Sequence, residues 1–271
     1  KRQQENSAKK IDGLNSTVRL VGFSSEGKRI IAVYENGTIK VWNLEAENIQ
    51  TFKTDASFMV RSAAISSDAK TIAMGSFEGK VITWDLDTNK STDVYEHKES
   101  KNTAIHSLSF SPLGKSLLIG CGDKSAVIRD LELDTDQIME HSNAVLATAF
   151  SPDGNLLVTG GQDATAVLWD VKGNSITQFN GHSKPIMSTD FSPDGEKLVT
   201  ASRDRTAILW DLKGNIIQEF VGHSSILNAV RFSPDGSSIL TGSNDNSARR
   251  WDIRTSLEET LKELGIEKTT R

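Results

Sequence analysis

The feature that most constrains the fold of this chain is a repeat with a step of 41 residues. The segments 141–170 and 182–211 are identical at 17 of 30 positions without a gap, and the pattern returns at 223–252. Each copy opens on a His, continues through a Pro-Asp-Gly turn and closes on Trp-Asp. Self-similarity at this period indicates an array of small structural units that stack on one another.

Each copy is expected to contain four short strands. The apolar-rich run from Ile186 to Phe191 ends at Ser-Pro-Asp-Gly, where Pro fixes φ and Gly tolerates a positive φ. The runs Lys197 to Ser202, Thr206 to Asp211 and Ile216 to Phe220 follow, each separated by turn residues. Short apolar-rich runs separated by turn residues indicate an all-β protein. One such sheet cannot bury both of its faces alone, so neighbouring copies must cover them.

On these residues the chain resembles the WD40-repeat family over about residues 5–253. The resemblance implies an all-β, WD40-type β-propeller. The last three repeats are especially regular and resemble propellers of prokaryotic multidomain proteins. The steps between the closing Trp positions are 42, 45, 40, 41 and 41 when Arg129 is counted as the third, which predicts six blades. The predicted repeats cover about residues 14–52, 53–97, 98–138, 139–179, 180–220 and 221–255.

The two ends of the chain carry separate predictions. Residues 5–11 stand where a fourth strand would precede the first repeat, so we expect them to close the ring by completing the sixth blade. A disordered arm, or a ring completed by sequence outside this chain, are the alternatives. Residues 256–271 begin with a capping box, Ser256 to Glu259, and predict a short amphipathic helix. Packing on a propeller face and docking of another domain are both open for that helix.

The family resemblance implies a hydrogen-bonded tetrad of His, Thr, Asp and Trp in each regular repeat, with a structural role. A hydrolase triad is the rejected alternative, because the grouping recurs at the repeat step. The first three copies lack the tetrad, since Leu14, Ala56 and Lys101 stand at the His position. In that half of the chain, either the sequence has been freed from the repeat pattern for other uses or the fold is less stable. The predicted tetrads are His141, Thr159, Asp163 and Trp169; His182, Thr200, Asp204 and Trp210; and His223, Thr241, Asp245 and Trp251.

Composition narrows the class of partner. The net charge of −5 and the pI near 5.6 favour neither nucleic acid nor an anionic membrane as a partner. The single cysteine, Cys121, excludes an internal disulfide framework and is compatible with a cytoplasmic location. The remaining histidines, His97 and His106, have no metal-like spacing, so no metal or cofactor is expected. The chain starts at Lys1 rather than Met, so we expect a processed chain or a piece of a longer one.

These observations favour a non-enzymatic scaffold that binds a protein or peptide on one propeller face. The alternative is a ligand-sensing or regulatory domain of a larger prokaryotic signalling or defence protein, in contact with other domains. A propeller enzyme is the remaining alternative. The family resemblance implies that the docking surface comprises the turns between second and third strands and the loops before first strands. The candidate partner-binding residues are Lys124, Gln162, Ser183, Lys184, Arg203, Arg205, Ser224, Asn244 and Asn246.

The last repeat departs from its neighbours at two adjacent positions. Ile208 and Leu209 of the fifth repeat are replaced by Arg249 and Arg250 in the sixth, which places one guanidinium on each face of a strand. Burying either charge without a partner would be costly. The two arginines therefore either reach acids at the rim or make an ionic contact with a partner or tail.

Overall fold

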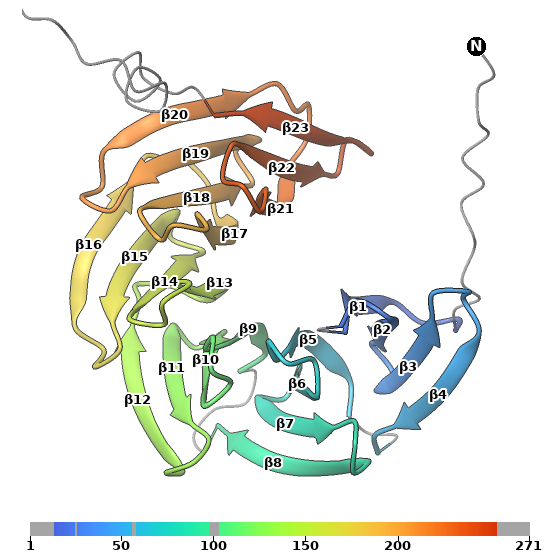
Figure 1. The fold of residues 1–271 in the computed structure, drawn as a ribbon. Helices are drawn as coiled ribbons and strands as arrows, with labels where there is room; N and C mark the ends of the chain where they lie inside the picture. The colour runs from blue at the N-terminus through green and yellow to red at the C-terminus, as the bar shows by residue number, and fades with distance from the viewer. Residues whose placement is uncertain (1–13, 25, 56–57, 98–102, 254–271) are drawn as a thin grey trace, which may run out of the picture.

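The computed structural model describes residues 14–24, 26–55, 58–97 and 103–253, and within them it contains 23 β-strands and no helix (Figure 1). The strands form six antiparallel sheets arranged around one axis, which confirms the predicted six-bladed propeller. The predicted closing strand at residues 5–11 and the predicted helix at 256–271 lie outside the described residues.

Each sheet is a simple meander, and we number the sheets as blades 1 to 6 along the chain. Blade 1 contains β1 (Val18–Phe23), β2 (Arg29–Tyr34), β3 (Thr38–Asn43) and β4 (Asn48–Lys53). Blade 2 contains β5 (Val60–Ile65), β6 (Thr71–Ser76), β7 (Lys80–Asp85) and β8 (Lys90–Glu96). Blade 3 contains β9 (Ile105–Phe110), β10 (Ser116–Cys121), β11 (Ser125–Asp130) and β12 (Thr135–Glu140). Blade 4 contains β13 (Val145–Phe150), β14 (Leu156–Gly161), β15 (Thr165–Asp170) and β16 (Ser175–Asn180). Blade 5 contains β17 (Ile186–Phe191), β18 (Lys197–Ser202), β19 (Thr206–Asp211) and β20 (Ile216–Val221). Blade 6 contains β21 (Leu227–Phe232), β22 (Ser238–Ser243) and β23 (Ala248–Asp252).

The first strand of every blade lies nearest the axis, and consecutive first strands contact one another from β1 through β5, β9, β13 and β17 to β21 (Figure 1). Side chains also link these strands at the repeat step. The Ser62 hydroxyl donates to the carbonyl of Ile105 at 2.8 Å, and Ser107 lies 2.9 Å from Thr148. The inner strands of adjacent blades are therefore joined by polar contacts as well as by packing.

The Ser-Pro-Asp-Gly turns connect the first and second strands, as their sequence predicts. In blade 5 the Ser192 hydroxyl accepts the backbone N–H of Lys197 at 2.8 Å and donates to Asp194. Gly195 takes a φ of 74°, in the left-handed region that favours glycine. The Asp and Ser side chains thus satisfy turn backbone groups that the sheet ladder leaves free.

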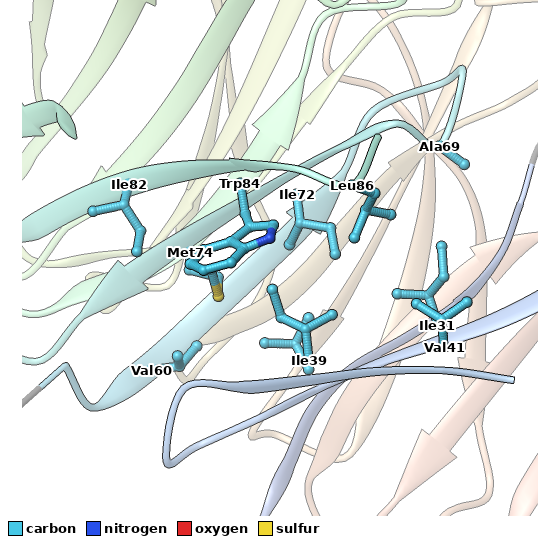
Figure 2. Packing of buried hydrophobic residues seen from close by; sticks show 11 residues of the cluster. Ile31, Ile39, Val41, Val60, Ala69, Ile72, Met74, Ile82, Trp84 and Leu86 are labelled. Atoms are coloured by element: carbon cyan, nitrogen blue, oxygen red, sulfur yellow. The ribbon is translucent and has the colours of Figure 1, made fainter. Parts of the chain in front are cut away.

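Most of the hydrophobic cores among the described residues lie between blades, and one smaller cluster lies within blade 1. Figure 2 shows one such core, in which Ile31 and Ile39 of blade 1 face Met74 and Trp84 of blade 2. Similar apolar clusters join blades 2 and 3, 3 and 4, 4 and 5, and 5 and 6. Because both faces of an inner blade are covered in this way, each blade depends on its neighbours for its burial.

The described parts of blades 1 and 6 leave some apolar side chains exposed on the face away from the neighbouring blade, although Ala32, Tyr34 and Trp42 on that face of blade 1 are buried. Ile31 points toward blade 2, so the alternating pattern places Val21 and Phe23 on the opposite face, where they are 68% and 64% exposed. Ile239 points toward blade 5, and Leu240 on the opposite face is 54% exposed. These two faces border the same opening of the ring (Figure 1).

The two arginines of the last blade find partners within the chain. Arg250 forms a 2.7 Å ion pair with Asp252 and donates to Ser238 at 3.2 Å. The Arg249 guanidinium lies 5.8 Å from the ring centroid of Trp251. The expectation that a head group reaches an acid is met by Arg250, whereas Arg249 contacts an aromatic ring instead.

The burial between blades predicts a large difference between two isoleucine truncations. Ile39→Ala, in the core between blades 1 and 2, removes a side chain that is 0% exposed and should lower the free energy of unfolding by about 2–5 kcal/mol. Ile138→Ala, on an outer strand where the side chain is 59% exposed, is the matched control and should change it by less than about 0.5 kcal/mol. Chemical denaturation of both variants measures the difference, and equal effects would contradict this account of the core.

Candidate functional site

The structure brings together the side chains of each predicted tetrad. In blade 5 the Trp210 indole N–H donates to the Thr200 hydroxyl at 2.9 Å, and Thr200 lies 2.8 Å from Nε2 of His182. Nδ1 of His182 lies 2.8 Å from Asp204. A neutral imidazole satisfies this chain of donors, because Nδ1–H donates to the carboxylate and Nε2 accepts from the hydroxyl.

The tetrads of blades 6 and 4 repeat the arrangement with one difference. In blade 6, His223 is 2.8 Å from Thr241 and 2.7 Å from Asp245. In blade 4, His141 contacts Thr159 at 2.5 Å, whereas its Nδ1 is 3.7 Å from Asp163 and makes no hydrogen bond to it. The indole N–H groups of these blades complete the tetrads: Trp251 donates to Thr241 at 2.8 Å and Trp169 donates to Thr159 at 2.7 Å.

The hydroxyl groups of the tetrads are enclosed within the fold. Thr159, Thr200 and Thr241 are at most 1% exposed, and each hydroxyl accepts an indole N–H. A hydroxyl so enclosed is not placed to attack a substrate. The grouping of His, Asp and Thr therefore ties the second and third strands to the loop that precedes the first strand.

The carboxylates of the tetrads are held in the charged form. Burial tends to raise the pKa of Asp204, but hydrogen bonds from His182 and Thr206 outweigh it and hold this pKa well below its usual range. A hydrogen bond from Ser247 and another from His223 lower the pKa of Asp245 against a smaller effect of burial. The folded state therefore favours both ionised carboxylates.

Blade 3 contains a partial substitute for the tetrad that the sequence did not reveal. His97 lies 2.5 Å from Asp123, which occupies the tetrad Asp position. The residue expected at the His position, Lys101, lies outside the described residues. Arg129, at the Trp position, forms ion pairs with Asp134 and with Asp136, the latter at 3.1 Å. The ion pairs of Arg129 thus stand in place of the indole, and the buried Ile119 stands in place of the hydroxyl.

Cys121 lies in the second strand of blade 3 and is fully buried. Burial raises the pKa of its thiol to about 12. The group is therefore protonated at neutral pH, as is typical of a buried structural cysteine rather than a reactive thiol.

All nine predicted partner-binding residues are exposed, and they share the face where second strands end and first strands begin. Gln162, Arg203 and Asn244 each follow a second strand directly, and their N–H groups bond to residues just before the first strand of the same blade. Ser183 and Ser224 donate backbone N–H groups to the tetrad carboxylates. The tetrads therefore fix the backbone of the surface on which these side chains stand.

A second ring of residues on this face was missed by sequence reasoning. In every blade the second residue of the first strand is skipped by the ladder, because a β-bulge shifts the register there. The freed side chains surround the mouth of the central channel and line a cavity of about 580 Å³. The six bulge residues are Arg19, Arg61, His106, Leu146, Met187 and Asn228.

The bulge residues contact the residues that follow the second strands. Arg19 pairs with Glu35 at 3.1 Å. The Arg203 side chain lies 3.2 Å from the sulfur of Met187, and Asn228 donates to Asn244. The predicted docking residues and the channel mouth thus form one continuous surface. A bulge leaves no trace in a hydrophobic pattern, but alignment of the repeats does show that this one position varies while its neighbours stay apolar or small.

Metal and membrane chemistry find no support in the described chain. Among the described residues, no group of three or more His, Cys, Asp or Glu side chains is arranged to hold a metal ion. The part of the chain that the structure describes contains no helix with the length and hydropathy needed to cross a membrane.

The sheets stacked around an axis, together with the recurring tetrads, define a repeat protein of the β-propeller class. The family model described as WD domain, G-beta repeat matches residues 7–43, 135–170, 173–211 and 214–252, which together make up more than half of the sequence. The chain belongs to the WD40-repeat family. The resemblance to propellers of prokaryotic multidomain proteins stays a prediction.

Three curated relatives illustrate the breadth of the similarity. The chain is 24% identical to U3 small nucleolar RNA-associated protein 12 of Saccharomyces cerevisiae, over 50% of this chain and 14% of that protein. It is 31% identical to the small ribosomal subunit protein RACK1 of Neurospora crassa, over 35% of this chain and 28% of the relative. It is 27% identical to the target of rapamycin complex subunit LST8 of Bos taurus, over 35% and 29%. The matches thus span less than a third of each relative.

The tetrad geometry predicts that Asp204→Asn destabilises the protein. The substitution removes the charge that orients His182 and accepts from Ser183, so at pH 7 the free energy of unfolding should fall by about 1.5–3 kcal/mol. Asp87→Asn, on a half-exposed ion pair with Lys70, is the control and should cost less than about 1 kcal/mol. Urea titration of both variants gives the comparison. Equal stability of Asp204→Asn and wild type would show that the tetrad carboxylate is dispensable.

The same carboxylate predicts a pH dependence with a definite sign. Because the folded-state pKa of Asp204 is depressed, its contribution is complete above the unfolded pKa of about 3.9 and is lost as the pH falls from there toward the folded pKa. The stability difference between wild type and Asp204→Asn should therefore be larger at pH 5 than at pH 3. Denaturation at both pH values tests this, and a difference that grows on acidification would refute the assigned sign.

Proposed function

We propose that this chain is a non-enzymatic interaction scaffold that binds a protein or peptide on the face formed by the turns after the second strands and the loops before the first strands. One observation carries the proposal. On this face, side chains that differ from blade to blade stand on a backbone that repeats from blade to blade. A rigid frame with variable exposed residues is the usual design of a recognition surface.

The charge and shape of the face support a macromolecular partner over a small substrate. The surface is broad, its predicted residues are polar, and the tetrad hydroxyls beneath it are buried. The printed names of the relatives describe an RNA-associated protein, a ribosomal subunit protein and a subunit of a complex, and each name implies membership of an assembly. We extend only that general role to this chain, together with a cytoplasmic setting.

Substitution on two opposite faces tests the proposal. Arg203→Ala with Arg205→Ala removes two exposed cations from the proposed docking face, in a turn whose Ala164 counterpart already tolerates alanine. Lys172→Ala with Lys213→Ala removes two cations from the turns between third and fourth strands, at the opposite end of the blades. We expect the first pair to weaken partner capture at least about tenfold and the second pair to leave it unchanged, because only contacts at the interface centre contribute strongly.

The measurement is affinity capture from the source organism's lysate with quantitative mass spectrometry of proteins retained by wild type and by each pair. Thermal unfolding of both pairs controls for folding. If a partner is lost equally with both pairs, or with neither, the assignment of the docking face is wrong.

A further inference from the structure

The mouth of the central channel carries a local charge opposite to that of the whole chain. Of the six bulge residues, Arg19 and Arg61 are cationic and none is acidic. The six residues that follow the second strands include one cation, Arg203, and one acid, Glu35. In a protein with a net charge of −5, the entrance to this cavity is therefore a positive site.

The two guanidinium groups share one aromatic platform and one carboxylate. The Arg19 and Arg61 groups lie 5.8 Å and 5.7 Å from the ring centroid of Phe77. Arg19 also pairs with Glu35, whereas the described chain offers Arg61 no ion pair within 4.0 Å. Partial burial and, to a smaller extent, the charge of Arg19 lower the pKa of Arg61, while Glu35 raises it. Two positive charges therefore face one negative charge.

Polar atoms without partners lie around the same cavity. Within the described residues, Nε of Arg19, Nδ1 of His106 and Oγ1 of Thr189 are buried and have no hydrogen-bond partner, and all three residues line the channel. Thr189 is only 3% exposed. Buried polar groups are normally hydrogen-bonded, so three of them around one cavity indicate a site that is completed by a polar ligand.

The side chains that line the cavity below its mouth are mostly small and uncharged. The cavity is lined there by Ser62, Ala63, Ser107 and Ala147, none of which carries a charge. A third cation, Arg231, also lines the cavity and donates to the Ser188 hydroxyl at 3.2 Å and to the Val230 carbonyl at 2.7 Å. Three cations and no acid therefore line the cavity, and two of the cations stand at its mouth.

We propose that the channel mouth binds a carboxylate side chain of an acidic peptide segment, which is held between Arg19 and Arg61 while the flanking peptide lies on the docking face. Guanidinium and carboxylate groups match in planar geometry, and charge-assisted hydrogen bonds between them are strong. One unmatched positive charge fits a single carboxylate better than a phosphate carrying nearly two charges. The inference rests on the proposed function, since it names the partner's chemistry at that same face.

A binding measurement with defined peptides tests the inference. The probe is a short peptide of alternating Gly and Glu with a terminal fluorophore, and its control is the same labelled peptide with Gln in place of Glu. We expect fluorescence anisotropy to show binding of the Glu peptide alone, weakening as salt is added. Arg61→Gln and Arg19→Gln should each weaken binding about tenfold or more. Arg29→Gln makes the same charge change in the same blade, at the far end of β2 from Glu35, and should leave binding unchanged.

A third variant separates binding from folding. Glu35→Gln removes the carboxylate that competes for Arg19, so it should tighten binding of the Glu peptide several-fold. A merely structural role for these residues would not produce a gain. Thermal unfolding of all variants shows that each is folded.

The outcomes are distinct. Binding of the Glu peptide that is lost in Arg61→Gln, kept in Arg29→Gln and strengthened in Glu35→Gln supports the inference. Absence of binding, equal binding of the Gln peptide, or competition by inorganic phosphate at lower concentration than the Glu peptide overturns it. If Arg203→Ala with Arg205→Ala abolishes capture of a partner that Arg61→Gln still retains, the docking face stands and the carboxylate site fails.

Discussion

Mutual burial of sheet faces is the constraint on which the rest of this structure depends. A four-stranded meander of six-residue strands has two apolar faces and no core of its own, so its stability comes from the sheets on either side. The fully buried residues accordingly gather between blades, as Ile39 and Met74 do between the first two. The polar links between inner strands, such as Ser62 to Ile105, then fix the angle at which one blade meets the next.

Rigid stacking leaves the ends of the strands as the places where sequence can vary. The β-bulge at the second residue of each first strand is the structural device that uses this freedom, because it turns one side chain per blade out of the ladder and toward the channel mouth. In blades 2 to 5 the residue before the bulge is buried and the residue after it is buried or half-buried, as Val60 and Ser62 illustrate around Arg61. Six positions whose residues can vary independently thus surround one entrance of the channel, and variation there does not disturb the hydrophobic core.

Much of the fold could be predicted from the sequence, because period, turn chemistry and strand length all point to the same architecture. Blade number follows from the Trp steps, and the tetrads follow from residues that recur in register, such as His182 and Asp204. The pairing of His97 with Asp123 could not be predicted, since extra residues precede the third blade and shift this His out of the repeat register. The repeat pattern locates a residue only where the connecting loops keep a constant length.

The channel mouth escaped prediction for a different reason. Arg19 and Arg61 lie in apolar strands, where a charged side chain is normally assumed to point into solvent and to have no further role. In addition, the net charge of −5 suggests an acidic surface. Only the bulge, which depends on three-dimensional register, brings them onto one platform at Phe77. Whole-chain charge is therefore a poor guide to the electrostatics of a small site, because exposed charges farther apart than a Debye length of about 8 Å are largely screened from one another.

The division of the ring into two halves ties these observations together. Blades 4 to 6 have the complete tetrads, and their bulge residues Leu146, Met187 and Asn228 are neutral. Blades 1 to 3 lack the complete tetrad, and their bulge residues include both arginines. The first half nevertheless has fully buried cores between its blades, with Ile72 and Leu117 at 0% exposure, so loss of the tetrad has not loosened its packing. The sequence left two explanations for the irregular half: its residues are free to serve recognition, or this half is less stable. The complete burial of its cores agrees better with the first explanation.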